Sequence, residues 1–130
     1  MTKMRKMSLV TNKVEVTNNF LPNGQFNLNP SMTLRTGKIS ENVFFNELNL
    51  EIKDKEEERF PINLFVSLKG IFEFEEIESE VEVFDFLKLQ GVQMVFPYLR
   101  AMVSSITSSS MFAPVILPII DVSQFFKDKN

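Results

Sequence analysis

Apolar and polar side chains alternate over residues 60–74, and this is the most regular pattern in the chain. The apolar positions that share one parity are Phe60, Ile62, Leu64, Val66, Leu68, Phe72 and Phe74. Because successive side chains of a strand point to opposite faces, the pattern predicts a strand with one buried face. Phe65 and Ile71 interrupt the polar parity, so the second face is not expected to be uniformly solvated.

Three further stretches predict the other strands of the same sheet. Residues 10–17 and 43–52 alternate in a similar way, and residues 26–35 do so less regularly because Pro30 cannot donate to a strand ladder. In the first of these strands, the side chains expected to share one face are those of Val10, Val14 and Val16. Short connections between the four stretches indicate an antiparallel sheet.

Residues 73–85 hold six glutamates and an aspartate. The stretch lacks the spacing of a calcium loop, and nothing in it fixes two carboxylates at the separation that glycoside hydrolysis requires. We interpret it as a solvated acidic connection. A charged docking surface and a catalytic carboxylate pair are the alternatives.

The period changes to that of a helix over residues 92–106, where apolar residues recur at steps of three and four. Pro97 lies either in the first turn of a helix that begins near residue 95 or at a bend. Residues 111–120 are apolar and contain two prolines, which predicts an extended arm. Asp121 and Gln124 have the spacing of a capping box, which predicts a short C-terminal helix.

Composition limits the chemistry that this chain can perform. It has no histidine and no cysteine, so the commonest general base and the commonest metal ligands are missing, and we expect no catalytic residue, metal site or cofactor. The net charge of -3 argues against binding to nucleic acid. Fourteen phenylalanines, with no tryptophan and one tyrosine, are more apolar aromatic surface than a small monomer can easily bury.

Length and hydropathy predict one soluble domain. The 130 residues show no internal repeat, so residues 1–130 are expected to form a single domain. The longest apolar run has ten residues, too few to span a membrane, and the N-terminus lacks the apolar core of a secretory signal. A cytoplasmic location without direct membrane insertion is expected.

Two sequence motifs resemble a known family. One is the segment 92–126, and the other is Gly70-Ile71-Phe72 at the end of the fourth predicted strand. Within the first, the matching positions are Phe96-Pro97-Tyr98, Arg100, Phe112, Leu117-Pro118, Asp121 and Phe125. Both motifs are similar to those of SecB-type protein-export chaperones. The resemblance implies an α+β fold: a four-stranded antiparallel sheet, a long helix, an extended apolar arm and a short C-terminal helix.

The resemblance also implies a function and an assembly. Family members form homotetramers, dimers of dimers in which first strands pair across subunits and long helices lie between dimers. They bind unfolded or precursor polypeptides in hydrophobic grooves without ATP, and many pass them to the SecA motor. We therefore expect an ATP-independent holdase and not an enzyme, with protein export as one setting. The alternative is a SecB-like chaperone or oligomeric adaptor dedicated to one partner, such as an antitoxin, without SecA docking.

SecA docking in the family is attributed to acidic side chains on the exposed sheet face. Here Phe65 stands at the position of the acid in the fourth strand, and Lys13 and Thr17 stand at the corresponding positions in the first strand. The resemblance therefore leaves open whether this chain binds SecA.

Candidate contact residues follow from the same reasoning, because a holdase and an oligomer both need exposed apolar surface. The candidates for client contact are Phe45, Phe65, Phe84, Phe86, Leu87, Phe112, Val115, Leu117, Phe125 and Phe126. The candidates for subunit contact are Val10, Val14, Val16, Leu64, Val66, Val95, Leu99, Met102, Val103 and Ile106. For the client set the alternatives are packing within the chain and burial between subunits. For the subunit set the alternative is burial in the core of the chain itself.

Overall fold

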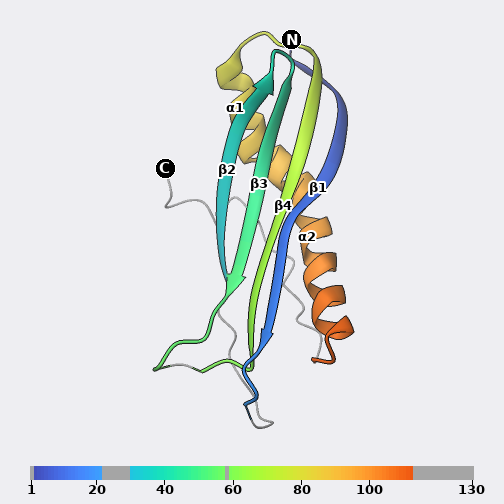
Figure 1. Cartoon of the computed structure of the whole chain (residues 1–130). Coiled ribbons are helices and arrows are strands. Elements are labelled where there is room, and N and C mark those ends of the chain that lie inside the picture. The colour runs from blue at the N-terminus through green and yellow to red at the C-terminus, as the bar shows by residue number, and fades with distance from the viewer. Residues whose placement is uncertain (1, 22–29, 58, 113–130) are drawn as a thin grey trace.

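A four-stranded sheet with two helices on one face makes up the described part of the chain (Figure 1). The computed structural model describes residues 2–21, 30–57 and 59–112. The elements in these ranges are β1 (Lys3–Asn18), β2 (Ser31–Ser40), β3 (Val43–Ile52), β4 (Ile62–Glu76), α1 (Glu80–Lys88) and α2 (Gln90–Ser109). The strands pair in the order β1-β4-β3-β2, and every pairing is antiparallel.

This architecture confirms the predicted α+β fold with a four-stranded antiparallel sheet followed by a long helix. The predicted strand at 43–52 is β3, and the predicted strand at 60–74 is β4 shifted by two residues. The predicted apolar arm and short C-terminal helix lie outside the described residues.

The core lies between the sheet and the helices. Even-numbered side chains of β4 face the helices, and Val66 and Phe72 among them are fully buried. From the helix side, Val95, Leu99 and Val103 recur at steps of four and are also fully buried. We call the opposite side of the sheet the open face, because neither helix covers it (Figure 1).

β1 reverses its alternation partway along. The register of β1 on β4 shifts between Thr11 and Lys13, as in a β-bulge. Val14, beyond the shift, lies on the helix side of the sheet, whereas Val10 lies opposite Lys69 on the open face. The prediction that three valines of β1 share one face is therefore wrong for Val10, because it assumed an unbroken strand.

The acidic stretch 73–85 is not a connection, since β4 and α1 occupy most of it. Ser79 caps α1, and its hydroxyl accepts a hydrogen bond from the N–H of Glu82 at 3.4 Å. Glutamates in the first turn are favourable at the positive end of the helix dipole. Val83 and Leu87, one turn apart, are buried against the sheet. Because glutamates alternate with the apolar residues here, the helical spacing of Val83 and Leu87 was not recognised in the sequence.

The helical segment is interrupted at Leu89, which ends α1 and precedes α2. Because α2 begins at Gln90, Pro97 lies inside the helix. Of the two predicted alternatives, the helix start near residue 95 is therefore wrong, and the position of Pro97 within a longer helix agrees with the other. Pro97 has no N–H to donate to the carbonyl of Gln93, one turn earlier. Its exposed position leaves that carbonyl on the solvent side of the helix.

Asn46 connects the sheet to this junction. Its side chain is fully buried, and its Nδ2 donates a hydrogen bond of 3.1 Å to the carbonyl of Leu87. The bond satisfies one of the carbonyls that a helix end leaves without an intrahelical partner. Gly91 permits this approach, because a Cβ at that position would lie 2.9 Å from Nδ2.

Replacing Asn46 with alanine is expected to destabilise the fold by about 1–3 kcal/mol, because the buried Leu87 carbonyl would lose its donor. Chemical denaturation at a fixed protein concentration measures this loss. Asn49→Ala, on the open face of the same strand, is the control and should cost less than half as much. Equal losses in the two variants would contradict the role given to Asn46.

Candidate functional site

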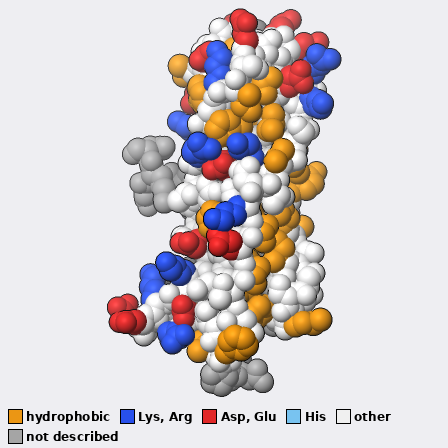
Figure 2. All heavy atoms as spheres, viewed as in Figure 1, with side chains coloured by type: hydrophobic (Ala, Val, Ile, Leu, Met, Phe, Trp, Pro, Cys, Tyr) orange, Lys and Arg blue, Asp and Glu red, His pale blue; other side chains and the backbone are white. Residues whose placement is uncertain are grey.

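Accessible apolar side chains gather on two surfaces of the described chain in the view of Figure 2. One is a column along the side where β1 runs beside α2, which we call the β1–α2 edge. The other is a group on the open face, above a band of charged side chains in the view of Figure 2. The two surfaces have different chemistry and are described in turn.

The β1–α2 edge combines apolar side chains with an unpaired strand. Val14 is 40% exposed on the helix side of β1, and the Thr11 hydroxyl lies 4.0 Å from the sulfur of Met102 on α2. β1 is the outer strand of the sheet, so one row of its backbone groups has no partner strand in the described chain. A long edge strand with an apolar margin is a template for pairing with another chain.

The structure divides the ten candidates for subunit contact. Five of them are at most 2% exposed and belong to the chain's own core, because the apolar stripe of α2 packs on β4 of the same chain; these are Leu64, Val66, Val95, Leu99 and Val103. Four lie on the helix side of β1 or on the partly buried side of α2; these are Val14, Val16, Met102 and Ile106. Val10 lies on the open face, and contact of these five exposed or partly buried residues with a partner stays a prediction.

A belt of polar side chains crosses the open face over all four strands. Its centre is the Glu47 carboxylate of β3, which accepts two hydrogen bonds of 3.2 Å from Arg35 of β2. The same carboxylate accepts from Asn12 of β1 at 2.8 Å and from Asn49 at 3.2 Å. Asn12 also donates to Ser67 of β4 at 3.2 Å. We call these five residues the polar belt.

The polar belt depends on the bulge in β1, because Asn12 lies between the two residues where the register shifts. Sequence reasoning missed the belt. Arg35 and Glu47 each occupy an ordinary polar position, and only the strand order and the bulge bring them together with Asn12. The hydrogen bonds from Arg35 hold the pKa of Glu47 below its usual range, although partial burial acts in the opposite direction.

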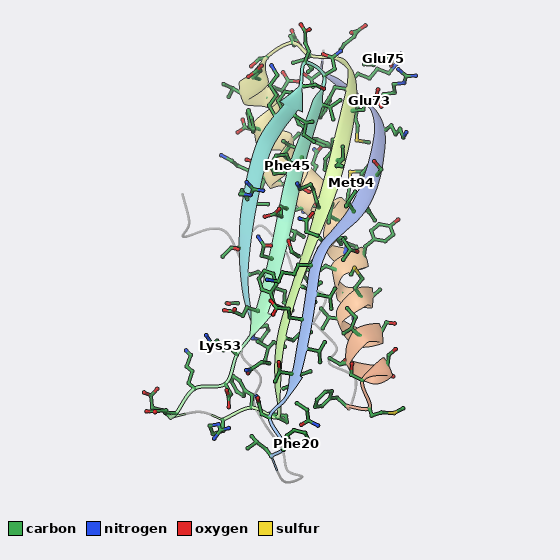
Figure 3. All side chains as sticks on the ribbon, viewed as in Figure 1. Phe20, Phe45, Lys53, Glu73, Glu75 and Met94 are labelled. Carbon is green, nitrogen blue, oxygen red and sulfur yellow. The ribbon has the colours of Figure 1, made fainter. Side chains whose placement is uncertain are left out.

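Two aromatic rings lie on the open face on either side of the polar belt. Phe45 extends from β3 on the face turned to the viewer in Figure 3. Its ring centroid is 5.1 Å from the Arg35 guanidinium and 4.6 Å from the Lys69 ammonium. The Phe65 ring lies 5.9 Å from the Lys13 ammonium, which pairs with Glu15 at 2.9 Å.

A shallow cavity of about 190 Å³ opens beside Phe65. Its lining includes Glu15, Glu51, Lys53 and Asn63. Pockets for small molecules usually enclose about 300–1,000 Å³, so this hollow is a surface feature and not a ligand chamber. Across residues 2–21, 30–57 and 59–112, acidic side chains nowhere gather in threes in a way that could hold a metal ion. Neither of the two helices in those ranges has the length and apolarity to cross a bilayer.

The described candidates for client contact lie on opposite sides of the sheet and cannot line one groove. Phe45 and Phe65 are on the open face. On the helix side, Phe84 packs edge-on to Phe44 with centroids 5.5 Å apart, and Phe86 packs similarly on Phe72 at 5.6 Å.

Of the other candidates on the helix side, Leu87 is fully buried and is a core residue, because α1 turns it onto the sheet. Phe112 is half-buried against the core. Val115, Leu117, Phe125 and Phe126 lie outside the described residues.

The described chain is thus an α+β scaffold: a sheet with one helix-covered face, one open face and an apolar edge. A family model described as "Preprotein translocase subunit SecB" matches residues 4–130. The chain belongs to the SecB family, and the resemblance inferred from its motifs is confirmed.

Relatives in two domains of life are similar to this chain. A protein of Methanocaldococcus jannaschii named "Uncharacterized protein MJ0357" is 33% identical over 100 residues, which are 76% of this chain and 64% of that protein. "Protein-export protein SecB" of Rickettsia akari is 27% identical over 100 residues, 76% of this chain and 65% of that protein. The chain thus spans just under two thirds of the length of these relatives.

A solved structure shares the fold at low sequence identity. It is the SecB-like chaperone Rv1957 of Mycobacterium tuberculosis, in complex with a ChAD peptide from the Rv1956 HigA1 antitoxin. The TM-score is 0.70 at 13% identity, and the match covers 92% of this chain and 90% of the other. At this identity the comparison establishes the fold.

Glu47→Gln is expected to lower the free energy of unfolding by about 1 kcal/mol at pH 7, because the charge-assisted bonds to Arg35 are lost. A lowered pKa in the folded state means that this stabilisation is present above the ordinary glutamate pKa of about 4.3 and is lost as pH falls through the lower folded value. Denaturation of both proteins from pH 7 to pH 3 should therefore show their stabilities converging. A difference in unfolding free energy that stays constant over this range would contradict the claim that ionised Glu47 stabilises the polar belt.

Proposed function

We propose that this protein is an ATP-independent chaperone that binds unfolded or precursor polypeptides. Membership of the SecB family carries the proposal. The amount of apolar surface left accessible on a small chain supports it: Phe20 is 84% exposed and Val81 is 71% exposed. Such surface is needed by a protein that stabilises unfolded chains by binding them, and it requires no chemical step.

The contacts with clients are proposed to be apolar and adaptable. Phenylalanine and methionine side chains can fit many sequences because their contacts are not directional. In the described chain, Phe84, Phe86 and Phe112 remain candidates on the helix side, where all three are only partly buried. Residues 1–130 are proposed to act as one cytoplasmic domain.

Assembly is proposed to use the β1–α2 edge. Pairing of β1 with the β1 of a second copy would satisfy the free backbone groups of this outer strand, and apolar residues such as Val14 and Met102 would be buried with it. We propose that four copies of this chain assemble into a homotetramer, formed as a dimer of dimers.

A dedicated partner is a second candidate setting, beside general protein export. The observation that favours it is the chemistry of the open face, where Phe65 and Lys13 contact each other at positions that the resemblance assigns to SecA-binding acids. The similar fold of the M. tuberculosis chaperone, which was solved with an antitoxin peptide, is consistent with this setting. Under this candidate, generic unfolded chains bind weakly and one protein co-purifies tightly.

Suppression of aggregation tests the proposed function. A model protein diluted from guanidinium chloride should scatter progressively less light as this chain is added, because captured chains cannot associate. ATP should not change the result. If a several-fold excess of this protein had no effect on the scattering, the proposal of a general holdase would be wrong.

Val14→Asp is expected to shift the assembly to a smaller species, because the change places a carboxylate in the apolar margin of β1. Size-exclusion chromatography with light scattering measures the mass against the 15.1 kDa of one chain. Val10→Asp is the matched control: Val10 is 43% exposed on the same strand but lies on the open face, so the assembly should persist. If both variants dissociate, or if neither does, the proposal that subunits associate through the β1–α2 edge is wrong.

A further inference from the structure

The group of apolar residues on the open face spans three strands, and we call it the Phe45 patch. It consists of Val10 of β1, Val43 and Phe45 of β3, and Ile71 of β4. Phe45 and Ile71 lie directly opposite each other, and Val43 and Val10 extend the patch along and across the strands. Figure 2 shows apolar side chains gathered on this part of the sheet, on one side of the charged band.

The Phe45 ring is held in place by its neighbours. It covers Gly37 of β2, where an added Cβ would lie 2.5 Å from the ring carbon Cε1. Arg35 and Lys69 lie within cation–π distance of the same ring, at 5.1 Å and 4.6 Å. A glycine beneath the ring and two cations beside it give the patch a fixed aromatic centre with a positive margin.

Among the described residues, Arg35 forms an ion pair and Lys69 does not. Arg35 forms an ion pair with Glu47 in the polar belt. Lys69 forms no ion pair within 4.0 Å among residues 2–21, 30–57 and 59–112; it lies opposite Glu47 in the strand register, and that carboxylate accepts two hydrogen bonds from Arg35. At the far end of the patch, Glu73 lies near Arg5 at 4.0 Å and opposite Lys6, so it does not balance Lys69.

The other ring on the open face, Phe65, has glutamates as well as lysines among its neighbours. Phe65 lies between Glu15 of β1 and Glu51 of β3 in the strand register. Lys13, which lies within cation–π distance of this ring, is paired with Glu15, and Lys53 lines the hollow beside the ring together with Glu15 and Glu51. The two rings of the open face therefore differ in their charged neighbours: two cations lie beside Phe45, whereas the lysines near Phe65 are accompanied by two glutamates.

We propose that the Phe45 patch docks a segment of a partner protein in which a large apolar side chain is flanked by carboxylates. The apolar side chain would cover Phe45 and Ile71, and a carboxylate would pair with the Lys69 ammonium, which forms no ion pair within the described part of the chain. Opposite charges across an interface select partners and fix their register. This assigns Phe45 to partner docking and not to the client contact predicted from its sequence position, and the assignment does not depend on the proposed holdase function.

Fluorescence anisotropy of the full chain with two labelled peptides tests this docking surface. Both peptides carry a central Leu-Phe pair between glycine-serine spacers; two aspartates flank the pair on each side in one peptide, and two lysines do so in the other. The wild type should bind the acidic peptide at least about tenfold more tightly, a preference of about 1.4 kcal/mol. Lys69→Glu should abolish or reverse the preference, and Phe45→Ser should weaken binding of both peptides.

Lys13→Glu is the matched control, because it reverses a lysine beside the other ring of the same face and should change binding of the acidic peptide less than about twofold. Equal binding of the two peptides by the wild type, or equal effects of Lys13→Glu and Lys69→Glu, would overturn the proposal.

Two further measurements distinguish a partner protein from the two other possible occupants of the Phe45 patch, a second copy of this chain and an unfolded client. Light scattering should give the same mass for Phe45→Ser, Lys69→Glu and the wild type; a smaller mass would make the patch a contact between copies and overturn the proposal. Suppression of aggregation should also be unchanged in Phe45→Ser, whose folding is checked by circular dichroism. A loss of suppression in a folded variant would make the patch a client site instead.

Discussion

The apolar stripe of α2 lies against the even-numbered side chains of β4, and the other features of the structure depend on this contact. Val95, Leu99 and Val103 are fully buried by it, and each such side chain contributes about 1.5–3 kcal/mol through burial. Because β4 of the same chain buries this stripe, the core does not need a second subunit to cover it. Surfaces for other molecules are therefore left at the β1–α2 edge and on the open face.

The bulge in β1 determines what each of these two surfaces contains. It keeps Val14 on the helix side while placing Val10 on the open face, and it directs Asn12 toward Glu47 of the polar belt. Without the bulge, Val10 and Val14 would share one face of β1. The Glu47 carboxylate would then lose the hydrogen bond from Asn12. One local irregularity thus separates the surface proposed for self-association from the surface proposed to dock a partner protein.

Much of the fold could be predicted from residue periodicity, and the failures have identifiable physical causes. β3, β4 and α2 have long, regular patterns that a single period explains. α1 was missed because its alternating glutamates imitate a solvated connection, and its buried positions, Val83 and Leu87, are only two. The stripe on α2 was expected at a subunit contact because a core and an interface require the same apolar spacing, and only coordinates distinguish them. The polar belt combines residues distant in sequence, so no local pattern could reveal it.

Hydrogen–deuterium exchange on the assembled protein and on Val14→Asp most directly tests the claim that the chain closes its own core. Exchange in residues 90–107 of α2 should be equally slow in the two proteins, because the same chain buries this helix in both. Exchange in β1 should become faster in the dissociated variant, because its outer edge would lose a partner strand. Fast exchange throughout α2 after dissociation, with β1 unchanged, would contradict the account and place the helix stripe between subunits.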